Sequence, residues 1–362
     1  MEAFYLDGLE DDGSTKNWFV RWTKIFSADK RSYIFMNIYL KTALLIFVTV
    51  LISPCLLGNE SELSNDTIKK GVLRTPDERF TDLHEFPFEP NYIFIDGLRI
   101  HYIDEGPRDA DPIILFHGEP TWSYLYRKMI PVFRESGGRV IAPDFFGFGR
   151  SDKPTIDSDI TYSFHRDSLL RLIEHLDLKN ITLVCQDWGG VLGLTLPLDM
   201  ADRFSRLIVM NTALPVGESL GEGFDMWKSY ASQFNDVSVS GLLAANCPGV
   251  VDMMDIAAYA APFPDATYKA GVRQFPELVA ISPEMEGTDF GVRAKEFWST
   301  EWTGKSFMAV GMLDPFFGKP IMDDLQRLIK NCPESLILND VGHFVQEWGE
   351  DVAKAALTSF ED

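Results

Sequence analysis

The chain has 362 residues, of which 46% are hydrophobic and 24% charged, and it carries a formal net charge of −21 at neutral pH. This composition is that of an ordinary globular protein with room for one large core. The strong negative charge argues against nucleic acid and acidic membranes as partners, because both are themselves anionic.

An uncharged apolar segment lies near the N-terminus, at residues 42–57. As a helix rising about 1.5 Å per residue it would span roughly 24 Å, which is short for a bilayer of about 30 Å and typical of an export signal. We therefore expect residues 1–58 to be a leader, with translation starting at Met36 and the mature protein exported to the periplasm. An uncleaved membrane anchor, or a buried helix of a cytoplasmic protein, is the alternative interpretation.

One catalytic domain with one insertion is expected after a polar linker at residues 59–72. Apolar, β-branched runs alternate with helical segments, and this alternation predicts a mostly parallel, doubly wound α/β sheet. We expect a core at residues 73–214 and 291–362 and a helical cap at 215–290. The expected strands lie at residues 92–95, 99–103, 113–116, 139–142, 181–184, 206–210, 307–310 and 336–338, with a helix at 162–176.

The strand expected at residues 113–116 delivers the sequence His117-Gly118-Glu119-Pro120. The pattern H-G-x-P is typical of a loop that binds an oxyanion through backbone N–H groups. We expect the Glu119 N–H to be one such donor, and the ring of His117 to tie loops together.

The run Gln186-Asp187-Trp188-Gly189-Gly190 follows a short apolar strand and precedes a segment able to form a helix. A tight turn between strand and helix lifts its central residue above the sheet, and in α/β-hydrolases this residue is a serine in the pattern G-x-S-x-G. Here an aspartate stands at that position. The sequence therefore predicts a carboxylate nucleophile, Asp187, with the Trp188 N–H as second oxyanion donor, and an ordinary serine esterase is disfavoured.

The other two members of a triad are expected later in the chain, in the order nucleophile, acid, base. Of the six histidines only His343 follows Asp187, and it lies just past the apolar run 336–338. Asp314 ends another apolar run and precedes a proline that stops the strand. We therefore predict His343 as the base and Asp314 as the acid that orients it.

These residues predict a displacement in two steps. A carboxylate can attack a saturated carbon in line, and water can then cleave the resulting alkyl ester at its carbonyl carbon, whereas the ether formed by a serine would persist. His343, with an unperturbed pKa of about 6.5, would be neutral near pH 7 and take the proton from that water. Two indole N–H groups, from Trp188 and from Trp227 in the cap, can hold a departing halide in a dry pocket.

The chain resembles the haloalkane dehalogenases, and within them the subfamily with an Asp-His-Asp triad and two halide-binding tryptophans. The resemblance covers residues 73–361 and rests on the stretches HGEPTWSYLYRKMIP at 117–131, APDFFGFG at 142–149, QDWGG at 186–190, AAPFPD at 260–265 and GHFVQE at 342–347. It implies the α/β-hydrolase fold, no cofactor or metal, and halogenated alkanes with chloride, bromide or iodide leaving groups as substrates together with water. The roles it implies are nucleophile for Asp187, base for His343, acid for Asp314, halide donor for Trp188 and Trp227, and oxyanion donor for Glu119 and Trp188.

The cap departs from the subfamily pattern. The connection between Asn211 and Trp227 is shorter, and residues 237–255 are dissimilar. Both segments should border the pocket, so the preferred size of the substrate stays open. Candidates for the pocket wall are Phe145, Phe146, Phe148 and Phe224.

Two other functions stay open. An epoxide hydrolase shares the H-G-x-P loop, the Asp-Trp pair and the base, but it needs cap tyrosines to protonate the epoxide oxygen, and Tyr230, Tyr259 or Tyr268 could serve. Gln186, where that family has a histidine, and Trp227 count against this alternative. A non-enzymatic binding protein of the same fold is the other candidate, and the complete triad disfavours it.

The four cysteines are too few and too scattered for a disulfide framework or a zinc site. Cys185 is expected to fill space in a buried strand, and Cys247 and Cys332 could pair in an oxidising compartment. Cys55 is a poor candidate for lipid attachment because Pro54 precedes it. We expect the protein to act as a monomer.

Overall fold

The computed structural model describes residues 68–247 and 250–361. The expected leader, with its apolar segment, Met36 and Cys55, lies outside the described residues, as does most of the polar linker. Within the described ranges, no helix is both long enough and apolar enough to cross a membrane.

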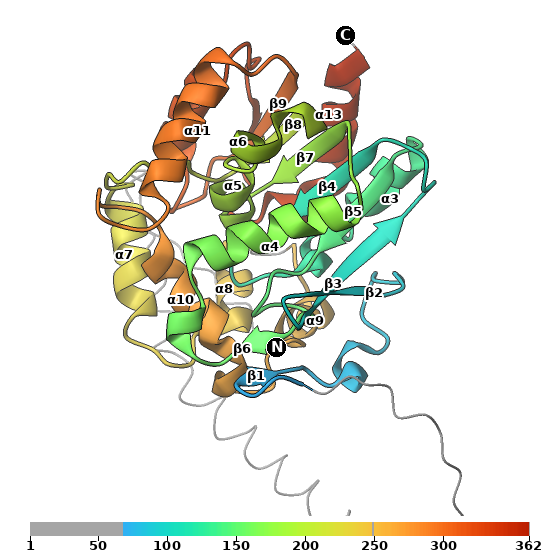
Figure 1. The fold of residues 1–362 in the computed structure, drawn as a ribbon, viewed down its shortest axis with the longest axis vertical. Helices are drawn as coiled ribbons and strands as arrows, with labels where there is room; N and C mark the ends of the chain where they lie inside the picture. The colour runs from blue at the N-terminus through green and yellow to red at the C-terminus, as the bar shows by residue number, and fades with distance from the viewer. Residues whose placement is uncertain (1–67, 248–249, 362) are drawn as a thin grey trace, which may run out of the picture. The chain divides into compact units, whose positions relative to one another are not determined.

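The central sheet has eight strands in the order β10-β9-β8-β7-β4-β5-β3-β2 (Figure 1). Neighbouring strands are parallel except in the pairs β2–β3 and β3–β5. Every expected strand lies within an observed one, so the prediction of a mostly parallel sheet is confirmed. The strands are β2 (Asn91–Ile95), β3 (Leu98–Glu105), β4 (Pro112–Phe116), β5 (Arg139–Pro143), β7 (Ile181–Cys185), β8 (Phe204–Met210), β9 (Lys305–Gly311) and β10 (Leu336–Leu338).

The two strands at the middle of the sheet, β4 and β7, consist almost entirely of apolar residues. Every residue of both is buried. A parallel strand covered by helices on both faces needs such a continuous run, whereas a strand with one wet face alternates. Cys185, at the end of β7, is fully buried and fills space there as expected.

Helices cover the sheet on both faces. The chain adds β5 on one side of β4 and then returns to add β7 on the other side, and right-handed crossovers therefore place α3 and α4 on opposite faces. In Figure 1, α4 crosses the near face together with α5, while α13 packs against α3. The helices outside the β8–β9 connection are α3 (Ile130–Glu135), α4 (Tyr162–His175), α5 (Trp188–Gly193), α6 (Pro197–Met200), α12 (Lys319–Leu328) and α13 (Gly349–Glu361).

The connection from β8 to β9 contains most of the remaining helices. Four of them, α7 (Glu222–Ala231), α8 (Val239–Asn246), α9 (Met253–Ala260) and α10 (Ala270–Leu278), lie within the segment expected to form the cap, and Figure 1 shows them gathered beyond one end of the sheet. The next helix, α11 (Thr288–Thr300), contacts α6. The division into core and cap at residues 215 and 290 stays a prediction.

Short elements complete the fold. A strand pair not predicted from the sequence joins β1 (Val72–Leu73) to β6 (Lys153–Pro154), so the end of the expected linker is held by backbone pairing. The 3₁₀ helices are η1 (Asp77–Phe80), η2 (Ser123–Tyr126), η3 (Asp157–Asp159), η4 (Ala201–Arg203), η5 (Ala266–Lys269) and η6 (Val345–Trp348).

The suggested pairing of Cys247 with Cys332 is wrong, because both thiols are free. Cys247 is buried at the end of α8, whereas Cys332 follows α12 on a different element.

Candidate active site

The candidate site lies at the carboxyl ends of β4 and β7. These two strands are neighbours, with Phe116 opposite Cys185 at their ends. The chain reverses the direction of strand addition next to β4, and a doubly wound sheet has its binding crevice at such a point. The loop after β4 carries Glu119 and the turn after β7 carries Asp187, so the topology brings both residues together.

Asp187 occupies the tight turn between β7 and α5. Its backbone angles, φ 51° and ψ −128°, lie in a region that residues with a side chain rarely adopt. Two hydrogen bonds hold this geometry: the Asp187 N–H donates to the Asn211 carbonyl at 2.9 Å, and the Thr212 hydroxyl donates to the Asp187 carbonyl at 2.6 Å. The side chain is therefore lifted from the sheet edge and fixed in direction.

Two glycines allow the surrounding backbone to approach this turn. A Cβ on Gly118 would lie 2.1 Å from Asp187 Oδ1, and one on Gly189 would lie 1.9 Å from the Phe116 carbonyl oxygen. A side chain at Gly118 would displace the Asp187 carboxylate, and one at Gly189 would displace the backbone at Phe116. The glycine of the H-G-x-P loop is thus required because the loop passes directly beside the carboxylate.

The Glu119 N–H donates a hydrogen bond of 2.6 Å to Asp187 Oδ1. This is the donor that the sequence predicted. The other expected donor, the Trp188 N–H, makes no hydrogen bond to the resting carboxylate within the described part of the chain. The expectation that this N–H points at the same oxygen of the resting carboxylate is therefore not met, and its role as donor to the tetrahedral oxyanion stays a prediction.

His343 and Asp314 lie together at the same edge of the sheet. The distance from His343 Nδ1 to Asp314 Oδ2 is 2.8 Å, and His343 Nε2 lies 3.5 Å from Asp187 Oδ2. The other oxygen of Asp314 accepts hydrogen bonds from the N–H groups of Phe316 at 2.7 Å and Phe317 at 3.2 Å. The acid is therefore anchored by backbone and points its free oxygen at the ring.

The expected unperturbed pKa of His343 is wrong for the resting protein. Burial lowers the pKa of the imidazole, but Asp314 and Asp187 together outweigh burial and raise it to about 10. Sequence alone could not give this result, because it depends on two carboxylates that reach the ring from distant parts of the chain.

A pocket opens over the nucleophile and the base. It encloses about 20 Å³, which is room for one or two water molecules, and Asp187 and His343 lie in its wall. The indoles of Trp188, from α5, and Trp227, from α7, both line it. The full lining is Glu119, Pro120, Asp187, Trp188, Phe224, Trp227, Leu242, Asn246, Pro276, Phe316, Phe317, His343 and Phe344.

The wall of the pocket differs from the expected one. Of the four phenylalanines expected there, only Phe224 lines it. Phe146 stacks on Phe164, and Phe148 packs against Phe275, so these side chains belong to the core. The missed residues Phe316, Phe317 and Phe344 follow the acid or the base within three positions in the sequence, and that proximity was the available signal.

The side chain of Glu119 also lines the pocket and is buried. Burial, together with the nearby charge of Asp187, raises its pKa well above the usual range. Both causes favour the uncharged form of the Glu119 carboxyl, whose Oε1 has no hydrogen-bond partner among the described residues.

His117 has the structural role expected for it. Its Nδ1 lies 2.9 Å from the Gly118 carbonyl oxygen and its Nε2 accepts from the Phe145 N–H at 2.9 Å. Burial lowers the pKa of this ring, so it stays neutral and bridges the loops after β4 and β5.

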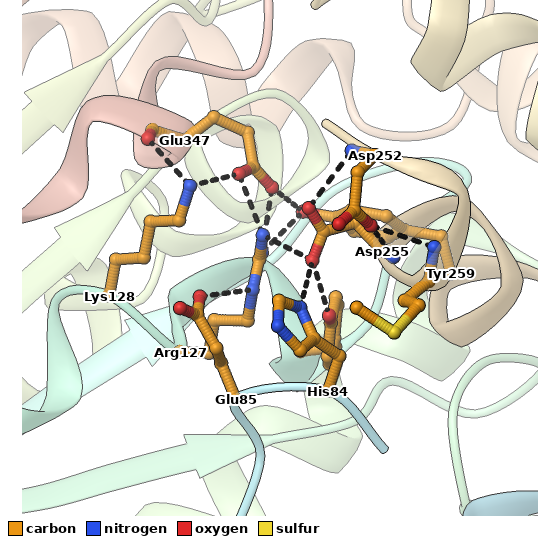
Figure 2. A network of polar contacts seen from close by, with 10 residues as sticks. His84, Glu85, Arg127, Lys128, Asp252, Asp255, Tyr259 and Glu347 are labelled. Atoms are coloured by element: carbon orange, nitrogen blue, oxygen red, sulfur yellow. Dashed lines mark hydrogen bonds and ion pairs between the residues drawn. The ribbon is translucent and has the colours of Figure 1, made fainter. Parts of the chain in front are cut away.

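A second cluster of buried charges lies close to the site in sequence and is shown in Figure 2. The carboxylate of Glu347 accepts two hydrogen bonds from Arg127, at 2.7 and 2.8 Å, and one from Lys128 at 2.9 Å. The hydroxyl of Tyr259, from α9, also donates to Glu347. We call these four residues the Glu347 cluster.

Asp255 extends this cluster toward the N-terminal part of the described chain (Figure 2). Its carboxylate contacts Arg127 at 3.0 Å, accepts from Tyr124 at 2.8 Å and lies 3.2 Å from His84 Nδ1. His84, Asp252 and Asp255 are spaced as metal ligands would be. The Asp255 carboxylate already has these three polar partners. One of them is the positively charged guanidinium of Arg127, which disfavours a metal cation beside it.

The three cap tyrosines considered for an epoxide hydrolase do not line the pocket. Tyr259 is fully buried and its hydroxyl is bonded to Glu347. The ring of Tyr230 packs against Trp227 and Phe234. The pocket that holds Asp187 therefore has no tyrosine in its wall among the described residues, which counts against an epoxide hydrolase.

Comparisons with known proteins agree on one family. Residues 111–350 match the family model described as "alpha/beta hydrolase fold". The chain is 44% identical over 300 residues to the haloalkane dehalogenase of Psychrobacter cryohalolentis, covering 80% of this chain and 98% of that protein. It is 39% identical over 295 residues to the haloalkane dehalogenase of Mycolicibacterium paratuberculosis, covering 79% and 97%.

A solved structure is similar over the same range. It is the haloalkane dehalogenase of Paraglaciecola agarilytica, which is described as tetrameric. The two proteins share 53% sequence identity, with a TM-score of 0.79 over 81% of this chain and 99% of that one.

Proposed function

The chain belongs to the haloalkane dehalogenases, enzymes of α/β-hydrolase fold that hydrolyse haloalkanes to an alcohol and a halide, and we propose how its residues carry out this reaction. The observation that carries the assignment is the carboxylate of Asp187 at the nucleophile turn, with Glu119 N–H on one oxygen and two indoles in the same pocket wall.

The first step is a displacement at the carbon that bears the halogen. The Asp187 carboxylate attacks in line, a carbon–oxygen bond forms, and the carbon–halogen bond breaks with its electron pair leaving as halide. The indole N–H groups of Trp188 and Trp227 hold the halide in a pocket that is otherwise mostly apolar. The product of this step is an ester between Asp187 and the alkyl group.

The second step hydrolyses that ester. His343 takes a proton from water, and the resulting hydroxide adds to the carbonyl carbon of the ester. The N–H groups of Glu119 and Trp188 hold the oxyanion. Its collapse expels the alkoxide, which takes the proton from His343 and leaves as the alcohol, while Asp187 regains a carboxylic group that ionises.

The change of charge at Asp187 links the two steps. In the resting protein the carboxylates raise the pKa of His343 to about 10, which favours the protonated ring before the ester forms. Alkylation removes the charge of Asp187 and with it one of the causes that raise that pKa. The base therefore becomes easier to deprotonate once the ester exists, which is when its free form is needed.

The test is halide release from a panel of short bromo- and chloroalkanes by the full-length chain, with the Asp187→Ala variant as control and an epoxide assayed in parallel. Halide release that disappears in the variant is the expected result. Diol formation from the epoxide without halide release would move the assignment to an epoxide hydrolase, and halide release by Asp187→Ala would remove Asp187 as nucleophile.

We also propose that the protein is exported, on the basis of the apolar segment at residues 42–57. N-terminal sequencing of the mature protein from cell fractions tests this, and Met1 at its N-terminus would contradict the proposal.

The expected monomer has to be compared with the tetramer described for the Paraglaciecola agarilytica relative. Light scattering coupled to gel filtration measures which of the two masses the chain has.

A further inference from the structure

Gln186, the residue directly before the nucleophile, contacts the base rather than the substrate. It is fully buried, and so is Gln346, while His343 is 2% exposed. The side-chain nitrogen of Gln186 lies 2.9 Å from His343 Nε2 and 3.1 Å from the His343 carbonyl oxygen. Its side-chain oxygen accepts from Gln346 Nε2 at 3.3 Å.

The orientation of the Gln186 amide follows from its partners. A backbone carbonyl oxygen can only accept a hydrogen bond, so the NH₂ group of Gln186 must be the end that faces His343. The opposite orientation would set two acceptor oxygens against each other at 3.1 Å. One N–H of Gln186 therefore goes to the His343 carbonyl oxygen, and the second is directed at His343 Nε2.

An N–H directed at Nε2 makes a hydrogen bond only if Nε2 carries no proton. The ring proton then sits on Nδ1, which faces Asp314 Oδ2 at 2.8 Å. We propose that Gln186 is a positioning residue that, once the Asp187 ester has formed, holds His343 as the neutral, Nδ1-protonated imidazole, the form that can take a proton from water. This inference rests on the proposed role of His343 as base.

Gln186 opposes the carboxylate of the nucleophile. In the resting protein Asp187 Oδ2 lies 3.5 Å from Nε2 and favours a proton there, while the Gln186 amide at 2.9 Å disfavours it. Alkylation cancels the charge of Asp187 but leaves the amide unchanged. The effect of Gln186 is therefore largest in the ester, and its role belongs to the second step of the reaction.

Water can take the place of the Gln186 amide at Nε2 without rearrangement of the surrounding side chains. A water that donates to Nε2 replaces the amide N–H at that atom. The Gln186 side chain keeps its bonds to the His343 carbonyl oxygen and to Gln346, so the ring and its neighbours stay in place.

The experiment separates the two steps in the full-length Gln186→Met variant, which keeps the side-chain length and removes the donor. Rapid-quench kinetics with 1-bromobutane give the rate of bromide release in the first turnover, and mass spectrometry of quenched samples gives the rate of ester decay. We expect the first rate to change less than twofold. Ester decay should slow about tenfold near pH 7 and recover as the pH rises, because losing one hydrogen bond to the neutral ring shifts the acid limb upward by about one unit.

A second variant, Gln186→Glu, gives the same test without an apolar side chain and should slow ester decay further, because a carboxylate beside Nε2 favours the protonated ring. Gln326→Met, on the outer side of α12, is the matched control, and its ester decay should match the wild type. Ester decay in both Gln186 variants that matches the wild type at every pH, or that is slower by the same factor at every pH, would overturn the proposal. A wild-type chain that forms no ester would instead contradict the proposed function itself.

Discussion

The active site and the Glu347 cluster are both buried groups of charges, and they differ in how completely the charges are paired. Each carboxylate oxygen of Glu347 has at least one cationic or hydroxyl donor, and these contacts hold its pKa below the usual value despite burial. Asp187 has one N–H on Oδ1 and only a distant imidazole, at 3.5 Å, beside Oδ2.

This difference separates a structural charge from a reactive one. A carboxylate whose oxygens are bound by a guanidinium and an ammonium is a poor nucleophile. Its contacts instead hold parts of the fold together. A carboxylate with an incompletely bonded oxygen facing a dry pocket can attack. The two groups are close in sequence, because Glu347 follows His343 by four residues on η6.

The largest effect is expected at the base. The His343→Gln variant should release one halide per enzyme and then stop at the ester, with steady turnover lowered on the order of 10³-fold or more. Mass spectrometry should find the protein heavier by one alkyl group. His175→Gln, on the exposed end of α4, is the matched control and should turn over normally. Undiminished steady turnover by His343→Gln would place the base elsewhere and remove the distinction between the two clusters.

The next largest effect concerns folding rather than chemistry. Glu347→Gln leaves Arg127 buried with a weakened partner, and removing one member of a buried ion pair lowers the free energy of unfolding by about 3–5 kcal/mol. Urea denaturation measures this loss. Glu350→Gln, at an exposed pair with Lys354 on α13, is the control and should leave the urea midpoint close to that of the wild type, because solvent screens an exposed ion pair.

The Glu347→Gln variant should also differ from His343→Gln in its kinetics. The folded fraction of Glu347→Gln should keep its rates of ester formation and ester decay within a few-fold of the wild type. A selective block of ester decay like that of His343→Gln would show that the Glu347 cluster takes part in the chemistry and is not purely structural.

A smaller effect is expected at the halide. Trp227→Phe removes one of two indole donors, and the loss of one hydrogen bond to an ion corresponds to roughly tenfold weaker bromide binding. Quenching of tryptophan fluorescence by bromide measures it. Trp302→Phe, in the core before β9, is the control with the same loss of an indole. Unchanged bromide affinity in Trp227→Phe would remove this residue from the site.

The smallest effects are the opposite pH dependences of the two clusters. The pKa of Glu347 is lowered from 4.5 in the folded protein, so its contribution to stability is present above pH 4.5 and is lost as the pH falls further. The pKa of His343 is raised from 6.5 to about 10, so its contribution is present below pH 6.5 and is lost as the pH rises toward 10. The stability difference between wild type and Glu347→Gln should therefore shrink in acid, and that for His343→Gln in alkali; the reverse pattern would contradict both assignments.

The sequence was sufficient to locate the strands of the main sheet and the catalytic candidates that follow three of them. Buried parallel strands need continuous apolar runs, so all eight strands of the main sheet could be located. Asp187, Asp314 and His343 each follow such a run, and the structure brings their side chains together. The β1–β6 pair was missed because two-residue strands carry no periodicity.

What could not be predicted depends on contacts between distant segments. The pKa of His343 is set by carboxylates from two other loops, and the partner of Arg127 lies 220 residues further along the chain. Gln186 could be recognised as unusual for an epoxide hydrolase, but its contact with the base required the structure. The phenylalanines of the pocket wall were misassigned because an aromatic residue fits a core and a pocket equally well.

The backbone of the nucleophile has a consequence for protein engineering. The angles of Asp187 are those of the first central residue of a type II′ turn, a position that glycine adopts without strain. Asp187→Gly should therefore relieve about 1 kcal/mol or more of backbone strain, which offsets part of what is lost with the hydrogen bond from the Glu119 N–H. A selection for thermal resistance alone would not register the loss of the nucleophile, so any such selection on this enzyme has to score activity in every round.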